Sequence, residues 1–505
     1  MNRRKALPFA PCLAALALAS CSGPFNGGNN NSGGTATVSF TLVSDTLPAN
    51  PSILSFKVSL NSIQITPTTG SAITLTPATP VVDLMRLQSD TAFLGSLAKV
   101  PAGTYTVTVS LATPASGSTI TFLNDTTSNI TNTSPAPCVP GAFCTATLTA
   151  SGSPSIASFT LTVTSTGNQG FGLHFNLKNA ISISNGTLSV NFNPAAPSPA
   201  VLSAFTLPRQ NANLGSSQLE LIEDFTGVVS LSGNNVTVTS PTRGAVTAAN
   251  ASASFFDASP DGKTCPTPAT FSCVVNGQIA SVDAFLNSDG TLSLKEFEPL
   301  VATQQDLVEG TVYLISSQTQ FGMVVTNKIQ AATNSLIGGI STGDLLTVNI
   351  PLAQPFFVDT KGLAVPAAAL GLFQGQSNTT AIHPGQKVAI HVTAFTAASG
   401  TTLASATADT VTLRWSRLIA GLTSSSTTTV NVNSVPSYFG ITPASGFPTQ
   451  VFSGTLGADG ITNLDGVTDA GGLNASLPVG LRVLYLENSI NSAQFPFMAA
   501  KIRQH

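Results

Sequence analysis

The segment Gly103-Thr104-Tyr105-Thr106-Val107-Thr108-Val109-Ser110-Leu111 places an apolar side chain at every second position from Tyr105 onward. A period of two is typical of a β-strand with one buried face, and the intervening Thr and Ser suit a solvated face. The same alternation recurs along most of the chain, for example at Val38, Phe40 and Leu42. Only the stretch from 84 to 97 favours helical spacing. The sequence therefore predicts an all-β protein.

Composition narrows the possible partners. The 505 residues include 19 Lys and Arg and 22 Asp and Glu, so charged residues make up 8 % of the chain. An ordinary soluble domain contains about 25 %. The net charge of −3 offers no basic surface for a polyanion, so nucleic acid is excluded as a partner. With 42 % hydrophobic residues the chain also lacks the composition of a disordered protein, and its length suits several domains.

The first 34 residues are typical of an export signal. A basic start at Asn2-Arg3-Arg4-Lys5 precedes a short apolar run, and Leu18-Ala19-Ser20-Cys21 resembles a bacterial lipobox. We expect a lipoprotein signal peptide at 1–21, a lipid on Cys21 and a flexible Gly/Asn-rich tether at 22–34. The lipid would be the membrane attachment and would place the protein in the bacterial cell envelope, at the outer membrane. The alternative is an ordinary signal peptide with an incidental cysteine.

The remaining cysteines agree with export. Without Cys12 of the signal and the lipidated Cys21, an even set is left in two close pairs. We predict two disulfides, Cys138–Cys144 and Cys265–Cys273. The alternative of a four-cysteine zinc site requires closer knuckle spacing than these pairs have.

Residues 35–195 resemble a family of exported bacterial lipoproteins, the domain-of-unknown-function family 4382. Three segments carry this resemblance: Val81-Val82-Asp83-Leu84-Met85-Arg86-Leu87, Pro101-Ala102-Gly103-Thr104-Tyr105-Thr106 and Gly172-Leu173-His174-Phe175-Asn176-Leu177. The family has no assigned activity. We expect a sandwich of the prealbumin or immunoglobulin type. Within it, Asn185-Gly186 between two alternating runs predicts a type I′ hairpin.

The rest of the chain contains a weak threefold repeat. Each unit opens with an apolar residue, one further residue and a glycine, at Gly227, Gly310 and Gly421. Each later has a glycine turn that leads into an apolar strand, at Asn276–Val282, Pro384–Ile390 and Pro478–Leu484. The pattern resembles the domain-of-unknown-function family 5666, which implies small β-barrels. We expect β units at 201–300, 301–416 and 417–505.

Two motifs suggest chemistry. Gly339-Ile340-Ser341-Thr342-Gly343, followed by Asp359 and His383, has the order of a serine hydrolase, but a strand rather than a helix is predicted after Ser341. The segment 287–297 is similar to the second half of a calcium loop, with Asn287, Asp289 and Glu296 as weak candidate ligands. Phe285 occupies the position of the first ligand, so a simple hairpin turned at Asp289-Gly290 is favoured.

The sequence thus predicts a non-enzymatic, lipid-anchored envelope lipoprotein without a cofactor or a bound metal. Its expected role is binding or scaffolding, with an envelope protein or a glycan as the ligand, facing the periplasm or the cell surface. The alternatives are a carbohydrate-binding adhesin and a secreted serine hydrolase that uses Ser341 and His383.

Overall fold

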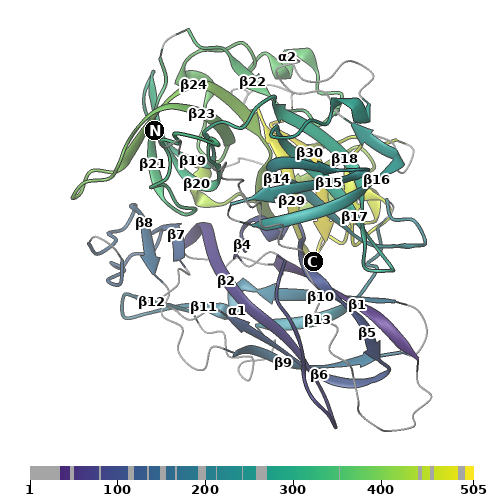
Figure 1. The fold of residues 1–505 in the computed structure, drawn as a ribbon. Coiled ribbons are helices and arrows are strands. Elements are labelled where there is room, and N and C mark those ends of the chain that lie inside the picture. The colour runs from purple at the N-terminus through teal and green to yellow at the C-terminus, as the bar shows by residue number, and fades with distance from the viewer. Residues whose placement is uncertain are drawn as a thin grey trace, which may run out of the picture. The chain divides into compact units, whose positions relative to one another are not determined.

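The computed structural model confirms the all-β prediction (Figure 1). It describes residues 34–504 apart from 46–50, 79–80, 112–118, 134–135, 148–154, 165–167, 191–200, 212, 242, 257–269, 352, 442–445, 455–459 and 487–494. Cys21 and nearly all of the predicted tether lie outside these residues. Helical structure in the described part is limited to single turns: η1 (Arg86–Gln88), α1 (Leu177–Ala180), η3 (Phe271–Cys273), α2 (Ala367–Leu370), η4 (Thr379–Ala381), η5 (Ser437–Phe439) and η6 (Ala470–Gly472).

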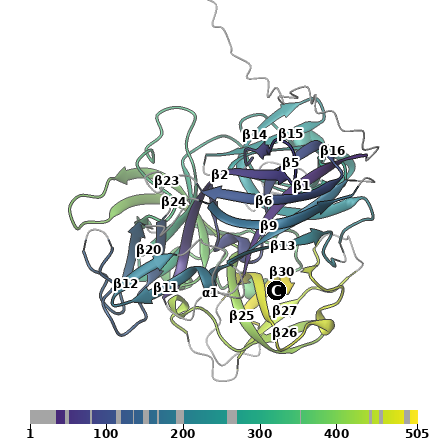
Figure 2. The same ribbon diagram turned by 90° about the horizontal axis from the view of Figure 1, so that it is seen from below.

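The N-terminal domain is a sandwich of two sheets. The smaller sheet has the order β13 (Leu202–Leu207), β10 (Gln169–Asn176), β1 (Thr35–Asp45) and β5 (Ala92–Pro101). The larger sheet has the order β8 (Phe143–Thr147), β7 (Thr119–Leu123), β2 (Ser52–Pro67), β6 (Gly103–Leu111) and β9 (Ser155–Val163), with β3 (Ile73–Leu75) and β4 (Val81–Asp83) also paired to β2. Figure 2 shows β1, β2, β6 and β9 from below.

The alternating apolar side chains of the two sheets meet in one core. Phe56 of β2 contacts Phe175 of β10 edge to face, with 6.4 Å between the ring centroids. Val107 and Val109, the residues that predicted the strand, are fully or almost fully buried in the same core. Asn185 and Gly186 turn the hairpin of β11 (Ile181–Ser184) and β12 (Thr187–Val190), both with the positive φ that a type I′ turn requires. The predicted hairpin is therefore confirmed.

The chain after the sandwich forms three closed five-stranded barrels. The first barrel comprises β14 (Gln218–Ser232), β15 (Asn235–Ser240), β16 (Gly244–Phe256), β17 (Ile279–Asn287) and β18 (Leu292–Val301). The second comprises β19 (Leu307–Ser317), β20 (Gln320–Ile329), β21 (Leu345–Asn349), β23 (Lys387–Thr396) and β24 (Ala404–Arg414), with β22 (Phe356–Val358) added to β24. The third comprises β25 (Ser416–Ser425), β26 (Thr429–Val432), β27 (Phe447–Val451), β29 (Pro478–Tyr485) and β30 (Phe497–Gln504), with β28 (Asn463–Asp465) added to β30.

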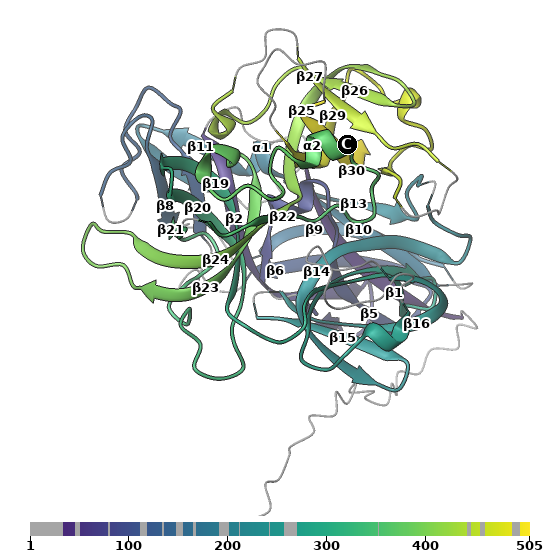
Figure 3. The same ribbon diagram turned by 90° about the horizontal axis from the view of Figure 1, so that it is seen from above.

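All three barrels share one strand order. Numbered within each barrel, the strands pair in the circuit 1-2-3-5-4-1, and only strands 3 and 5 run parallel, as in β16 and β18, β21 and β24, and β27 and β30. This is the strand order of the OB-type barrel, a small Greek-key barrel. Figure 3 shows the three barrels from above in teal, green and yellow. The prediction of tandem barrel-like units after a sandwich is confirmed.

Close contacts between strands explain why glycine occupies the repeated positions. Gly227 and Gly310 lie on the first strand of their barrels, where a Cβ atom would come within 2.4 Å of the Thr239 carbonyl oxygen and 2.6 Å of the Val324 carbonyl oxygen. The first and second strands therefore cross too closely for a side chain. Gly421 holds the same place on β25, where a Cβ would be 2.7 Å from the side-chain oxygen of Asn433.

One domain boundary differs from the expectation. The sequence assigns 201–300 to the first β unit, but β13 pairs with β10 and completes the smaller sheet of the sandwich. The Pro-rich run at 194–199 suggests a boundary, yet the chain adds one more edge strand to the sandwich before the first barrel begins at Gln218.

The barrels and the sandwich share apolar contacts. Leu484 and Met498 of the third barrel belong to the core of the second, and Leu54 of the sandwich packs with the core of the third. Phe143 of β8 contacts Tyr313 of β19 with 4.5 Å between the ring centroids. The described residues from Gly34 onward thus belong to one compact unit.

The close crossing at Gly227 gives a testable prediction. We expect Gly227→Ala to lower the free energy of unfolding by about 1–3 kcal/mol, because the new methyl group meets a backbone oxygen that cannot move aside. Chemical denaturation followed by fluorescence measures the change. Gly472→Ala is the matched control, since a Cβ atom at that position would have open space within 4 Å. Equal stability of the two variants would contradict the explanation.

Candidate functional site

The charged side chains gather where the sandwich and the three barrels meet. Nineteen of the charged residues that the structure describes are buried, eleven acidic and eight basic. In a chain with so few charges this is a large share. Most of them, together with Arg417, form one group, which we call the junction network: Arg86, Asp90, Glu220, Glu223, Asp224, Arg243, Asp283, Glu296, Glu298, Glu309, Asp359, Lys361, Lys387, Arg414, Arg417, Asp465, Arg482, Lys501 and Arg503.

Asp224 is the centre of the junction network. Its carboxylate lies 2.9 Å from the Lys361 Nζ of the second barrel, and 2.7 and 3.2 Å from Arg417 and Arg482 of the third barrel. Its backbone carbonyl accepts hydrogen bonds from Arg86 of the sandwich and from Arg243 of its own barrel. One residue therefore binds cations from all four domains.

The backbone at the centre is unusual. Asp224 interrupts β14 at a register shift between Ile222 and Phe225, and its φ is +49°. Lys361, its partner in the second barrel, has φ of +45°. A residue that carries a Cβ atom adopts this left-handed backbone conformation only at a cost in free energy, so the surrounding contacts must hold both residues in place. The Asp224 amide donates to Asp283 at 2.8 Å, which fixes the turn.

Arg503 links the third barrel to the sandwich. Arg503 of β30 pairs with Asp465 at 2.6 Å and donates to the Asp90 carbonyl oxygen at 2.6 Å and to the Thr91 hydroxyl at 2.7 Å. The Asp90 carboxylate in turn lies 2.7 Å from Arg417 and 3.2 Å from Arg86. The segment around η1, which carries part of the motif 81–87, is therefore fixed to the third barrel.

A third group joins the first two barrels. Arg414 of β24 lies 2.5 Å from Asp359, 3.7 Å from Glu309 and 3.9 Å from Glu298 of the first barrel. Lys387 lies 3.2 Å from Glu309. Acidic groups predominate in the first barrel and basic groups in the third, so the two faces are complementary.

The pKa values follow from burial and from these partners. Burial opposes ionisation of Asp224, but Arg482, Lys361 and Arg417 together hold its pKa well below the ordinary value. Burial likewise opposes ionisation of Glu309, and Lys387 and Arg414 lower its pKa to about 2. Glu220 behaves in the opposite way, because burial and the nearby Asp465 raise its pKa to about 7.

Small cavities lie against the junction network. The cavity next to Arg86, Lys387 and Arg417 has a volume of about 40 Å³, and one bounded by Glu223, Lys361 and Arg482 has about 30 Å³. Organic ligands generally occupy roughly 300–1,000 Å³. These cavities therefore suit water or small ions, and the geometry of the junction network is that of an internal structural site.

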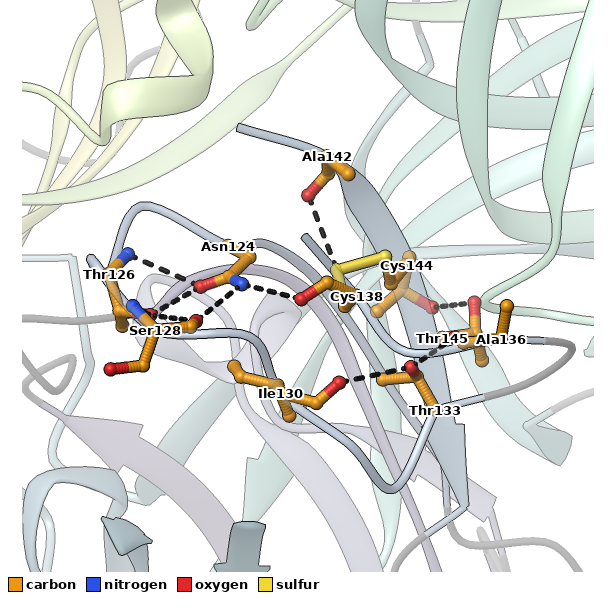
Figure 4. Close-up of a disulfide and its surroundings, with 11 residues drawn as sticks. Asn124, Thr126, Ser128, Ile130, Thr133, Ala136, Cys138, Ala142, Cys144 and Thr145 are labelled. Carbon is orange, nitrogen blue, oxygen red and sulfur yellow. Dashed lines mark hydrogen bonds between the residues drawn. A yellow bond between two sulfur atoms is a disulfide. The ribbon is translucent and has the colours of Figure 1, made fainter. Parts of the chain in front are cut away.

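The predicted Cys138–Cys144 disulfide is present in the sandwich (Figure 4). It ties the end of the β7–β8 loop to β8. The Asn124 side-chain amide donates to the Cys138 carbonyl oxygen at 2.8 Å and to the Ser128 carbonyl oxygen at 3.1 Å. Cys273 is buried, but Cys265 lies outside the described residues, so the second pairing stays a prediction.

The weak calcium candidates are not brought together. Asp289 accepts hydrogen bonds from the backbone and the hydroxyl of Thr291 at the tip of the β17–β18 hairpin, while Glu296 is buried 3.4 Å from Lys361. Distance along the hairpin separates them, since Glu296 is paired in register with Asp283 while Asn287 lies at the other end of β17, next to the turn. No group of three acidic, histidine or cysteine side chains in the described part could hold a metal ion.

The structure does not arrange Ser341, Asp359 and His383 as a serine hydrolase requires. Ser341 is exposed in a turn held by Asp344, and this turn leads into β21, not into a helix. The Asp359 carboxylate binds Arg414 and so does not orient a histidine. His383 packs near the ring of Tyr485, 6.2 Å between centroids.

Sequence reasoning missed the junction network. A signal was present, because charged residues interrupt strongly apolar strands at Leu219-Glu220-Leu221-Ile222-Glu223-Asp224 and at Ala499-Ala500-Lys501-Ile502-Arg503. Buried charges are almost always paired, so such interruptions indicate mutual partners. Which strands supply these partners depends on the packing of the barrels.

The chain matches no protein-family model, no curated protein and no solved structure. Among the residues that the structure describes, no helix has the length and hydropathy needed to cross a bilayer.

The central carboxylate gives a second prediction. Asp224→Asn keeps the shape and tolerates the positive φ but leaves buried cations unpaired, so we expect a loss of about 3–5 kcal/mol in the free energy of unfolding. Denaturant titration followed by circular dichroism measures it. Asp289→Asn, at an exposed hairpin tip, serves as the control and should change stability by less than about 0.5 kcal/mol. A similarly small effect at Asp224 would refute its central role.

Glu220 gives a prediction about pH. Its pKa of about 7 in the folded protein exceeds the ordinary glutamate value of 4.5. The wild-type protein therefore loses stability as the pH rises from about 4.5 to 7, and loses no more above pH 7. Glu220→Gln removes this penalty, and we expect the variant to be the more stable by about 1–3 kcal/mol at pH 8 and nearly equal at pH 4.5. Thermal unfolding across pH 4–8 measures the difference.

Glu309→Gln is the control of opposite sign. The pKa of Glu309 is about 2, so its charge stabilises the fold above pH 4.5 and this contribution is lost as the pH falls toward 2. This variant should be the less stable one at neutral pH. If both variants shifted stability in the same direction, the assigned pKa directions would be wrong.

Proposed function

We propose that the protein is an exported bacterial envelope lipoprotein, anchored through lipid on Cys21, with a non-enzymatic binding or scaffolding role at the outer membrane. The single observation that carries the proposal is the joining of four β domains through the junction network. The charges that could perform chemistry are paired with each other inside the protein, at Asp224, Arg414 and Arg503. The proposed role is therefore presentation of a rigid surface.

Export is supported by two independent features. The lipobox-like Leu18-Ala19-Ser20-Cys21 precedes a Gly/Asn-rich stretch of the kind that keeps a domain at a distance from a membrane. The Cys138–Cys144 disulfide suits an oxidising compartment such as the periplasm or the cell surface. The resemblance of 35–195 to the domain-of-unknown-function family 4382 points in the same direction and stays a prediction.

The outer faces of the barrels favour weak, neutral contacts. On β24 the residues Thr407, Thr410 and Thr412 are half-buried and flank the buried Ala408 and Val411. The ligand expected for such a surface is an envelope protein or a glycan, recognised by hydrogen bonds and not by charge.

A carbohydrate-binding adhesin is the second candidate. One observation favours it, since OB-type barrels can bind oligosaccharides across strands 2 and 3. The large hydrophobic side chains that are exposed in the described residues are aliphatic, however, for example Leu314, Leu403 and Val139. A stacking platform for sugars would need exposed aromatic rings, so scaffolding is the better supported role.

The anchor gives a fourth prediction. We expect Cys21→Ala to move the protein from the membrane fraction to the soluble envelope fraction, because the only proposed attachment is lost. Cys12→Ala, inside the signal, should leave the distribution unchanged. Mass spectrometry of the N-terminal peptide checks that the wild-type protein carries lipid on Cys21. An unmodified Cys21, or a mature N-terminus elsewhere, would remove the anchor from the proposal.

Protease shaving then distinguishes the two orientations. Release of barrel peptides from intact cells would indicate the surface, and release only after permeabilisation would indicate the periplasm. The non-enzymatic role is tested separately with the purified protein. A hydrolytic turnover that Ser341→Ala abolishes would overturn it.

A further inference from the structure

A cavity of about 40 Å³ lies where the sandwich meets the second and third barrels. Three cationic side chains line it: Arg86 of η1, Lys387 of β23 and Arg417 of β25. The rest of its wall consists of three hydroxyl-bearing residues and two apolar ones: Thr311, Thr326, Tyr438, Leu54 and Met85. We propose that this cavity is a binding site for a small monovalent inorganic anion of halide size.

Arg86 supplies the first reason. The side chain is 9 % exposed, and its Nη2 donates to the Asp224 carbonyl oxygen while its Nε lies 3.2 Å from Asp90. The remaining Nη1 is buried without a hydrogen-bond partner. A buried, charged donor without a partner is costly, and an anion in the cavity that this side chain lines would satisfy it.

The local balance of charge supplies the second reason. The carboxylates that pair with the cavity cations are Asp90, Asp224 and Glu309. Asp224 is shared with Lys361 and Arg482, so it neutralises Arg417 only in part. The wall of the cavity itself therefore carries three cations, and no carboxylate is among the residues that line it.

The pKa values of the two bases reflect the same buried, cation-rich wall. Burial lowers the pKa of Lys387 to about 7, and Arg417 and Arg86 oppose its protonation further although Glu309 favours it. Burial also lowers the pKa of Arg86, with Arg417 as the next cause. Burial is the main cause of both shifts and the neighbouring cations add to it, so a bound anion would favour the charged form of both bases.

Size and surroundings set the class of ligand. A site for one water needs roughly 10–15 Å³ measured in this way, so the cavity has room for a halide and about one or two waters. Phosphate esters and organic acids of metabolite size are too large. Leu54 and Met85 keep part of the wall apolar, and a low local dielectric strengthens the attraction between the anion and the three cations.

The adjoining cavity repeats the pattern on a smaller scale. It has about 20 Å³ and shares Arg86 and Thr326 with the first, and it adds Arg243 and Thr342. The Thr342 hydroxyl is also buried without a partner. This cavity includes Asp83, a carboxyl that accepts hydrogen bonds from Ser55 and Phe56, so we assign the anion to the larger one.

Bromide is the probe for the site. Crystals of the purified protein grown in sodium bromide should show an anomalous peak in the cavity, in contact with Arg86 and Lys387. In solution, the thermal midpoint should rise with chloride at constant ionic strength, made up with isethionate, and should level off. The proposal would be overturned if the cavity held only water in bromide crystals, or if the thermal midpoint did not change with chloride concentration.

Two hydroxyl variants test the site without breaking an ion pair. Tyr438→Phe and Thr311→Val remove donors from the cavity wall, and each should weaken the chloride-dependent shift several-fold while the protein stays folded. Tyr313→Phe is the matched control, since Tyr313 is a buried tyrosine outside this cavity and should leave the shift unchanged. An identical chloride response in all three variants and the wild type would place the anion elsewhere and refute the assignment.

Discussion

The ion contacts of Asp224 are the constraint on which the arrangement of the four domains depends. This one residue binds cationic side chains of the sandwich, of its own barrel and of both other barrels. Its backbone amide donates a hydrogen bond to Asp283. A buried carboxylate is stable only if its charge is matched and its lone pairs are satisfied. The four domains must therefore pack in one arrangement, because any other arrangement leaves charged side chains buried and unpaired.

Such a network contributes more to specificity than to net stability. The attraction between buried ions is largely offset by the cost of removing them from water, so an apolar interface of equal area would hold the barrels together as well. Apolar contacts such as those of Leu484 and Met498 already link the barrel cores. We interpret the junction network as the feature that sets which barrel faces which, since the three barrels share one strand order and could otherwise exchange places.

The same arrangement explains the unusual composition. A chain with 8 % charged residues has few to distribute, and a large part of them lies in the interior. The outside is left to Ser, Thr and Asn, which hydrogen-bond without strong long-range attraction. Under the proposed function, such a neutral surface would contact a neighbouring protein or glycan of the envelope. The proposed anion site lies within the junction network and concerns its internal balance of charge.

The sequence by itself determined the strands and their repetition. Alternation such as that at Tyr105, Val107 and Val109 depends only on the period of the backbone, and Asn185-Gly186 fixes its hairpin through local φ preferences. The repeat glycines at 227, 310 and 421 could be found because a close strand crossing excludes any side chain. Tertiary structure alone decided the partners of Glu220, Asp224, Arg482 and Arg503. Pairing of charges depends on which strands meet across barrels hundreds of residues apart, and no local pattern encodes that distance.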